Sequence, residues 1–546
     1  MQSADCKVKN DTVQHSYLFW LPHFALCSLH FALCTLSSIA AAADPIEADV
    51  LLKGGTIFDG SSSDGHIGDV AIDGDRIVGV GNFDLKSAKW TIDCKGFVVA
   101  PGFIDLHNHS DSQIVAPRTR ANINFLMQGC TTIVTGNCGS GPIDVGEYYS
   151  KINAAGAGTN VAHLLPQGSL RGHVVGSAQR AAKPDEIAKM RDLADKAMQD
   201  GAWGMSTGLI YVPSSYADTD ELVAIAKVIG KHGGIYASHI RGEGKDLLES
   251  IHEAIKIGRD GGCSIHVSHF KASGEEAWGL VRPASALIEA TRKEGLRVTA
   301  DQYPYIASST SLDATLLPTW ALAGGRDKLL ERLKDKEQAA RISEFVANRL
   351  DKSRGGATVK IAAYSPKPAW IGRNLAEIAN AEKTKPLDIA LTIVRNGGAS
   401  VVNFGMSEED VRFVMQQPWV ATASDGSAKL PAADKPHPRS YGTFSRKLGE
   451  YAIKEKVIPL AAAIRSSSSL PAEILGLPDR GTLKAGHFAD VVVFDPKTIR
   501  DTATFDDPHQ YATGMKFVFV NGDVAVKDGS STGALSGRAL KRPDAK

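Results

Sequence analysis

Short runs of valine and isoleucine, separated by glycine-rich turns, occur at both ends of the chain. Near the N-terminus these runs are "VLLKGGTIFDG", "DVAIDGDRIVGVG" and "WTIDCKGFVVAPG", and near the C-terminus they are "GTLKAGHFADVVVFD" and "KFVFVNGDVAVKDG". Short β-branched runs bounded by glycine turns are typical of antiparallel strands. The pattern predicts one small β-sandwich domain formed from both termini, with residues 44–100 as its first part and 476–546 as its second.

Between these ends, apolar runs of strand length alternate with segments of helical period. The strand-like runs are "TTIVTG", "NVAHLL", "AWGMSTG", "GIYASH", "SIHVSH", "RVTADQYPY" and "VATASDG". After Pro184 the apolar residues recur on one helical face, and "DTDELVAIAKVIG" combines an acidic first turn with a glycine at its end. Repeated strand–helix units across residues 101–475 predict an α/β protein with a (β/α)8 TIM-like barrel.

The stretch from about 312 to 400 breaks this alternation. Its sequence "LLPTWALAGGRDKLLERLKDKEQAARISEFVANRL" has helical character and lengthens one strand-to-helix connection. Such connections lie at the mouth of a barrel, so we expect an insertion near the mouth that shapes a pocket. The first strand-to-helix turn carries no glycine-rich phosphate-binding fingerprint, which disfavours a dinucleotide-binding fold.

Length and charge exclude some classes of protein. The 546 residues exceed one ordinary core, and the 43% hydrophobic and 22% charged residues are typical of a globular chain. Lys+Arg and Asp+Glu both total 61, so the formal net charge is zero. We therefore expect no nucleic-acid partner, because no positive field attracts one. Composition leaves the oligomeric state open.

The N-terminal segment differs from the rest of the chain. Residues 17–36 contain no acidic residue, lysine or arginine, and Ala41 and Ala43 then fit an A-x-A cleavage site. We predict a signal peptide over residues 1–43, export to the periplasm or medium, and no stable membrane association after its removal. Acidic residues balance the lysines that precede the apolar run. A retained anchor, a mis-chosen start codon and a cytoplasmic location are the alternatives.

Side chains that bind metals stand at the ends of the predicted strands. The segment "PGFIDLHNHSD" places two histidines one residue apart, so both imidazoles share one face of an extended strand. The other candidates end later strands, and in a barrel these ends meet at one mouth. The full set is His107, His109, Cys138, His239, His269 and Asp425.

The chemistry of this set indicates zinc. Imidazole and thiolate suit Zn²⁺ best among the common ions. A Cys/His/His set with one open position lowers the pKa of a bound water to about 7. Asp425 would then take the proton of this water and pass it to a leaving group.

These motifs resemble the D-aminoacylase (N-acyl-D-amino-acid deacylase) family of the metal-dependent amidohydrolase superfamily. The matching segments span about residues 48–528 and are "PGFIDLHNHSD", "GNCGSG", "YASHIRGE", "HVSHFKASG", "DQYPYIASST", "SDGSAKLPAADKPHPRSYGTFSR" and "GTLKAGHFADVVVFD". Dihydroorotase and hydantoinase relatives bridge two metals with a carboxylated lysine, and "AWGMSTG" contains no lysine. The resemblance implies zinc-dependent hydrolysis of a small N-acyl-D-amino acid to a carboxylate and a free D-amino acid.

The resemblance also implies roles for single residues. Cys138, His239 and His269 would hold the tightly bound zinc. His107, His109 and Asp425 would line a second, weaker metal position, and Asp425 would be general base and then general acid. Cations and hydrogen-bond donors would hold the α-carboxylate of the substrate. In this sequence they are Arg439, Lys271, Tyr303 and Ser309.

Two departures from the family pattern bear on specificity. Gln167 in "LLPQGSLRG" stands where relatives often carry a histidine. Acid-selective relatives place an arginine near the proline of "ATLLPTW", where this chain has Leu316 and Leu317. We therefore predict an apolar pocket and a neutral substrate side chain, such as that of D-leucine, D-methionine or D-phenylalanine.

Two alternatives remain open at this stage. One is an amidohydrolase acting on a cyclic amide, as hydantoinase and dihydroorotase do, or on a peptide-like amide. The other is a catalytically inactive barrel that serves as a scaffold for protein binding. The presence of all six candidate ligands argues against an inactive barrel.

Overall fold

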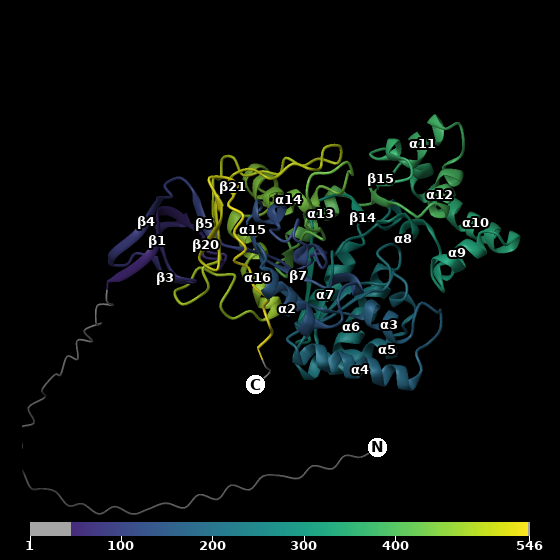
Figure 1. The fold of residues 1–546 in the computed structure, drawn as a ribbon, viewed down its shortest axis with the longest axis horizontal. Helices are drawn as coiled ribbons and strands as arrows, with labels where there is room; N and C mark the ends of the chain where they lie inside the picture. Colours follow the sequence, from purple (N-terminus) through teal and green to yellow (C-terminus); the bar gives the residue numbers. More distant parts are fainter. Residues whose placement is uncertain (1–44, 544–546) are drawn as a thin grey trace, which may run out of the picture. The chain divides into compact units, whose positions relative to one another are not determined.

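A computed structural model describes residues 45–543 of the protein (Figure 1). The predicted signal peptide at residues 1–43 lies outside the described residues. Within the described part of the chain, no helix has both the length and the apolar composition needed to span a bilayer.

Parallel strands form the central part of the fold. One sheet contains β6 (Phe103–Asp105), β7 (Cys130–Thr135) and β8 (Asn160–His163). A second contains β9 (Leu165–Pro166), β10 (Gly204–Gly208), β11 (Ile235–His239), β12 (Ser264–Val267), β13 (Val298–Gln302) and β17 (Val420–Thr422). Only Leu164 separates β8 from β9. The segments after β6 and β17 are hydrogen-bonded to each other, with Asp425 N 2.8 Å from His107 O.

Helices connect these strands and cover them. They are α1 (Ile123–Leu126), α2 (Val145–Ala155), α3 (Gln167–Val174), α4 (Pro184–Gln199), α5 (Thr219–Lys231), α6 (Leu247–Gly261), α7 (Val281–Lys293) and α13 (Glu408–Met415). The apolar face predicted after Pro184 is buried in α4, where Met190 and Ala194 pack against the strands. At the start of α5, Asp218 accepts a hydrogen bond from Glu221 N at 2.8 Å, which satisfies a free helix donor.

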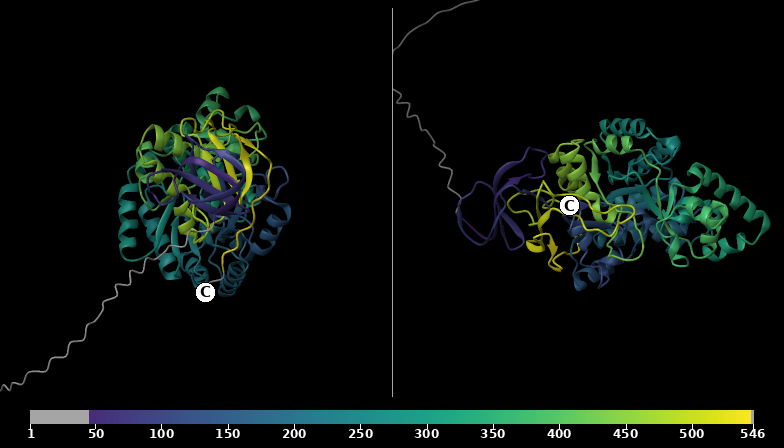
Figure 2. Two further views of the ribbon diagram at one scale, coloured as in Figure 1. Left: turned by 90° about the vertical axis from the view of Figure 1, so that its left-hand side faces the viewer. Right: turned by 90° about the horizontal axis from the view of Figure 1, so that it is seen from above.

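Strands from both ends of the described chain share one nine-stranded sheet. The N-terminal strands are β1 (Ile46–Ile57), β2 (His66–Asp73), β3 (Arg76–Gly81), β4 (Leu85–Asp93) and β5 (Val98–Pro101). The C-terminal strands are β18 (Val491–Phe494), β19 (Met515–Val520), β20 (Asp523–Lys527) and β21 (Ser530–Ser531). They meet where β18 pairs antiparallel with β5, and Figure 2 shows the purple and yellow strands side by side.

Both faces of β18 are covered. Val491 and Val493 pack into a core within the terminal sheet, while Val492 and Phe494 pack toward the helices that follow β17. Those helices are α14 (Arg439–Arg446), the π-helix η8 (Lys447–Lys454), α15 (Leu460–Ser467) and α16 (Ser469–Leu475). Burial of both faces explains why β18 is a continuous apolar run.

The insertion contains a sheet that its sequence did not reveal. Its elements are β14 (Ser308–Ser311), α8 (Leu312–Leu316), α9 (Arg326–Arg332), α10 (Lys336–Lys352), β15 (Val359–Ala363), α11 (Leu375–Ala381), α12 (Pro386–Arg395) and β16 (Ser400–Asn403). The antiparallel order β14–β16–β15 extends this unit beyond the predicted limits of 312 and 400. The sequence "SSTS" of β14 has no apolar alternation, so the pattern could not predict a strand there.

A buried polar network joins β8 to the terminal sheet. Arg480 forms an ion pair with Asp490 and donates to Asn521 Oδ1 at 2.8 Å. Asn521 in turn donates through Nδ2 to Asn160 Oδ1 at 2.8 Å. Arg480 and Asp490 are 4% exposed, so little water replaces either partner when one is removed.

We expect Arg480→Met to lower the free energy of unfolding by about 3 kcal/mol, because it leaves the Asp490 carboxylate buried without its cation. The free energy of unfolding from urea titration measures this loss. Arg259→Met is the control, because the Arg259–Glu294 pair is exposed, and we expect less than about 1 kcal/mol there. Equal losses in the two variants would show that the buried network does not stabilise the junction.

Candidate active site and metal centre

Three candidate ligands meet at the ends of three strands. His239 is the last residue of β11, Cys138 lies in the turn η2 (Asn137–Gly139) after β7, and His269 follows β12 by two residues. Cys138 Sγ lies 3.8 Å from His239 Nδ1 and 3.7 Å from His269 Nε2. Tetrahedral zinc with ordinary Zn–S and Zn–N bonds separates sulfur and nitrogen by about 3.6 Å. The spacing of these buried side chains therefore fits one zinc ion.

The backbone turns sharply at three of the candidate ligands. Cys138, His269 and Asp425 have φ angles of 50°, 37° and 52°, in the left-handed region that residues other than glycine rarely adopt. Such conformations persist where the surrounding structure holds them, and they cluster at functional sites. Here the turns lie directly after β7, β12 and β17, where they place the side chains in the common cluster.

The other candidate ligands lie against the same sulfur and against Asp425. His107 Nε2 is 3.2 Å from Cys138 Sγ, and His109 Nε2 is 3.1 Å from Asp425 Oδ1. His107, His269 and Asp425 form a further group whose ligand atoms lie within 4.8 Å of one another. All six residues predicted from strand ends are thus brought together. His107 and His109 follow β6, which ends at Asp105.

Electrostatics favour the ligand form of Cys138. Burial by itself raises the pKa of the Cys138 thiol, but His107, His109 and His239 together outweigh burial and hold that pKa well below its ordinary value. A thiolate is the form that binds a metal. The net shift is opposite at Cys263, where no charged partner compensates for burial and the pKa rises to about 12. Cys263 therefore remains a protonated core thiol.

Two carboxylates orient the histidine rings. Asp301 Oδ2 lies 2.8 Å from His266 Nε2 and 3.4 Å from His107 Nδ1. Glu243 Oε1 lies 3.0 Å from His269 Nδ1 and accepts a hydrogen bond from Lys271 Nζ at 2.5 Å. Each carboxylate leaves the Nε2 of its ring directed at Cys138, which is the usual way of fixing a metal-binding imidazole.

The residues predicted to bind the substrate carboxylate border this cluster. Arg439, the first residue of α14, places Nη1 2.7 Å from Asp425 Oδ2, and its guanidinium lies 4.8 Å from the centre of the Tyr303 ring. The Tyr303 hydroxyl is buried and has no hydrogen-bond partner among the described residues. Ser309 contributes its carbonyl to Arg439 at 3.2 Å, whereas its hydroxyl donates to Val401 O. A cationic site with a free hydroxyl thus lies beside the metal ligands.

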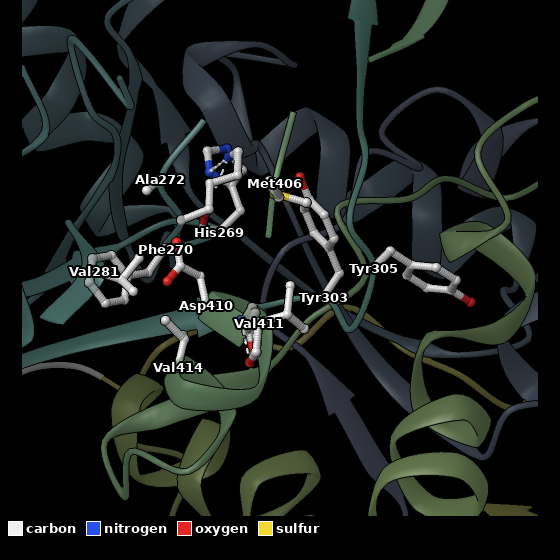
Figure 3. Close-up of a pocket in the computed structure, with 12 residues that line it drawn as sticks. His269, Phe270, Ala272, Val281, Tyr303, Tyr305, Met406, Asp410, Val411 and Val414 are labelled. Carbon is white, nitrogen blue, oxygen red and sulfur yellow. Dashed lines mark hydrogen bonds between the residues drawn. The ribbon is translucent and has the colours of Figure 1, made fainter. Parts of the chain in front are cut away.

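A small pocket of about 10 Å³ adjoins the same residues (Figure 3). His269, Lys271, Gln302, Tyr303 and Asp410 are among its polar lining residues, and Met406 packs with Tyr303 (Figure 3). Much of the remaining wall is apolar and includes Phe270, Val281, Val411 and Val414. The pocket therefore presents an apolar surface next to the candidate metal centre.

A model of the amidohydrolase family matches residues 91–526 of the chain. This protein belongs to the amidohydrolase family. Its curated relatives include D-aminoacylase of Alcaligenes xylosoxydans xylosoxydans, which is 36% identical over 90% of this chain and 98% of the relative. N-acyl-D-aspartate deacylase of the same organism is 34% identical over 92% of this chain and 96% of the relative. The predicted resemblance to D-aminoacylases is confirmed.

Comparison with solved structures agrees with the assignment of this chain to the amidohydrolase family. A crystal structure of D-aminoacylase aligns with a TM-score of 0.79 and 34% identity, covering 91% of this chain and 100% of that one. The N-acyl-D-glutamate deacylase of Bordetella bronchiseptica, complexed with zinc and a phosphonate inhibitor, aligns at 0.77 and 30% over the same shares. A D-hydantoinase at 17% identity and a TM-score of 0.55 shares the fold.

The structure places the three residues at which the sequence departs from the family pattern. Leu316 and Leu317 are buried in the core of the insertion and do not line the pocket beside Tyr303, contrary to prediction. Helix α8 turns its leucines inward because the insertion has an apolar core of its own. Gln167 lies at the start of α3, where its Oε1 accepts a hydrogen bond from Ser214 and its Nε2 donates to Glu221 at 3.3 Å.

Glu243 and Asp301, which contact the histidine ligands, were not predicted from the sequence. Asp301 is an acidic residue in a buried strand, and a buried acid needs a partner, whereas Glu243 lies in a half-buried loop after β11. That signal was present for Asp301 in "RVTADQYPY", whereas the polar context of Glu243 in "YASHIRGE" gave none. The sequence gives no means of identifying the partner, because each carboxylate bonds to a residue from another strand or turn.

Proposed function

We propose that the protein is a zinc-dependent N-acyl-D-amino-acid deacylase. The observation that carries this proposal is the approach of Cys138 Sγ to His239 and His269 within 3.8 Å, beside Asp425. The relatives that cover nearly the whole chain include D-aminoacylase and two N-acyl-D-amino-acid deacylases, which supports a linear D-substrate. The sequence of β10, "GMSTG", contains no lysine that could be carboxylated to bridge two metals as in hydantoinases.

Each residue of the site has a definite task in this reaction. Cys138, His239 and His269 would hold Zn²⁺, whose chemistry is to activate a water and polarise the amide carbonyl. His107 and His109, with Asp425, would form a weaker second metal position. Asp425 accepts the proton of the attacking water and then donates it to the leaving nitrogen. This protonation lets the nitrogen leave as a neutral amine.

Arg439 and Tyr303 orient the substrate through its α-carboxylate. The guanidinium offers charged donors and the buried Tyr303 hydroxyl lacks a partner among the described residues, so a carboxylate satisfies both. Lys271, held by Glu243, adds a second cation at 5.9 Å from the Tyr303 ring. An anionic substrate is therefore positioned with its amide toward Asp425.

We expect Arg439→Met to lower kcat/KM for N-acetyl-D-leucine about 10–100-fold more than for N-acetyl-D-leucinamide. The amide lacks the carboxylate that Arg439 binds, so it reports any loss that comes from disturbing Asp425, the present partner of Arg439. Steady-state kinetics on both compounds give the ratio. An equal loss with the two compounds would mean that Arg439 does not recognise the carboxylate.

We infer a preference for neutral apolar side chains from the apolar residues that lie beside Tyr303. Phe270, Val411 and Val414 offer no donor to a second carboxylate, and the charge of Lys271 is already shared between Glu243 and the α-carboxylate of the substrate. We expect kcat/KM for N-acetyl-D-leucine to exceed that for N-acetyl-D-glutamate by about tenfold or more, because a buried unpaired charge is costly. A panel of paired enantiomers measures this ratio together with the D preference, and faster turnover of the glutamate compound would overturn the inference.

We also infer that the parallel strands form one closed (β/α)8 barrel. The hydrogen bonds between the segments after β6 and β17, and the single residue between β8 and β9, support closure.

The shared terminal sheet supports a β-sandwich domain made from residues 44–100 and 476–546. The apolar segment 17–36 and the A-x-A sequence that follows it at Ala41 and Ala43 support export. N-terminal sequencing of the mature protein tests this inference.

A further inference from the structure

A second cleft of about 680 Å³ opens beside His109. Its walls include His109, Val115, Ser140, Pro142, Ile143 and Tyr148, which come from the segments after β6 and β7 and from α2. None of the residues predicted to bind the substrate carboxylate lines it. The mechanism proposed above gives this cleft no role.

The cleft lies across the metal centre from part of the carboxylate site. Ser140 follows Cys138 at the end of β7, whereas Lys271 and Tyr303 follow β12 and β13. Strands β8 to β11 stand between β7 and β12 in the series of parallel strands. The His109 side chain is 30% exposed and contacts Asp425, so its ring forms a wall shared by the catalytic centre and the cleft.

The shape of the substrate directs its acyl group toward this cleft. In a trans amide, the acyl chain and the α-carbon lie on opposite sides of the C–N bond. With the carboxylate on Arg439 and the scissile carbonyl at the metal ligands, the acyl chain extends away from Arg439. We infer that the cleft beside His109 binds the acyl group of the substrate, and that this group is neutral, apolar and longer than acetyl. The inference rests on the deacylase function proposed above.

The lining of the cleft fits such a group. Val115, Pro142 and Ile143 are half-buried and present apolar surface, and the buried Tyr148 adds an aromatic ring. An acetyl group has a single methyl carbon and leaves most of a cleft of this size empty.

The charged groups of the cleft disfavour an anionic chain. Glu147 pairs with Lys151 at 2.7 Å and Asp144 lies 3.9 Å from Lys196, so the cations near the rim already have acidic partners. Asp111 accepts a hydrogen bond from Gly136 N at 2.7 Å. A second carboxylate in the acyl group would meet these acids without a free cation among the lining residues.

Kinetics with two acyl chains test the inference on the zinc-loaded protein. We expect kcat/KM for N-hexanoyl-D-leucine to exceed that for N-acetyl-D-leucine by about tenfold or more, since each added methylene in an apolar pocket is worth about that factor. Ser140→Trp fills the cleft from an exposed position with extended backbone, and we expect it to lower the hexanoyl-to-acetyl ratio by about tenfold or more.

Two further variants guard against an indirect effect. Ser150→Trp places the same bulk on the exposed surface of α2 but outside the cleft, so the ratio should stay within about twofold of the wild-type value. Ile143→Ala removes apolar lining without adding bulk and should lower the ratio in the same direction as Ser140→Trp. A wild-type ratio near one, or a ratio that Ser140→Trp and Ile143→Ala leave unchanged, overturns the inference.

A binding measurement separates failure of this inference from failure of the deacylase function. If neither acyl compound is hydrolysed, the proposed function is wrong. Calorimetric titration with sodium hexanoate and sodium acetate still reports on the cleft, because both carboxylates reach the metal centre and only hexanoate extends beyond it. Hexanoate binding that Ser140→Trp weakens about tenfold more than acetate binding supports the inference, and equal weakening overturns it.

Discussion

Replacing Cys138 with alanine is expected to remove the tightly bound zinc and to lower kcat/KM for N-acetyl-D-leucine by at least about 10³-fold. The sulfur lies within 3.8 Å of both histidine nitrogens, so its loss leaves two ligands at a site that needs three. A catalytic metal contributes several kcal/mol to the barrier, and about 1.4 kcal/mol corresponds to a tenfold change in rate. Zinc analysis of the purified protein and steady-state kinetics measure the two effects.

Cys263→Ala is the matched control for this substitution. Cys263 is also buried, but its thiol donates to Ala226 O, and its pKa of about 12 keeps it protonated. We expect this variant to retain its zinc and to keep kcat/KM within about twofold of the wild-type value. A Cys138→Ala protein with full zinc and full rate would show that the metal is held elsewhere.

Replacing Asp425 with asparagine is expected to lower kcat by about 10²–10⁴-fold while the zinc content stays at one equivalent. An amide keeps the size of the side chain and can still contact His109 and Arg439, but it cannot accept and return a proton. The three ligands of the tightly bound ion are unchanged, so metal loss does not explain the lower rate. Rapid-quench or steady-state kinetics with parallel zinc analysis distinguish these causes.

Asp434→Asn controls for the loss of a carboxylate near the same loop. Asp434 pairs with Lys429 and His509 and does not belong to the metal cluster. We expect its kcat to remain within about twofold of the wild-type value. Wild-type kcat in the Asp425→Asn protein would remove Asp425 from the mechanism.

The six candidate ligands could be predicted from the sequence because each stands at or just after the end of a strand. Parallel strands converge at one end, so positions such as His239 and His269, one strand-helix unit apart, are brought together by topology alone. This prediction requires no information on how the side chains pack.

Contacts that depend on side-chain direction could not be predicted in this way. Leu316 was expected in a substrate pocket, but the insertion has an apolar core that buries it. Ser309 was predicted to bind the substrate carboxylate, and the pairing of β14 with β16 directs its hydroxyl to Val401 in the structure. The sequence of β14 gave no strand signal, so neither this pairing nor the resulting orientation could be foreseen.

Contacts between residues from distant segments could not be predicted from the sequence either. Asp301 is recognisable as an acid in a buried strand and Glu243 is not, and the geometry alone shows that they orient His107 and His269. The cleft beside His109 depends on three separate segments and on the volume that they leave between them. Pattern and periodicity carry no information on such a volume.

X-ray absorption at the zinc edge, on protein loaded with one equivalent of the metal, tests the central claim most directly. The account predicts one sulfur neighbour at about 2.3 Å and nitrogen or oxygen neighbours at about 2.0–2.1 Å, with the sulfur absent in Cys138→Ala. A spectrum of the wild-type protein with only nitrogen and oxygen neighbours would contradict it.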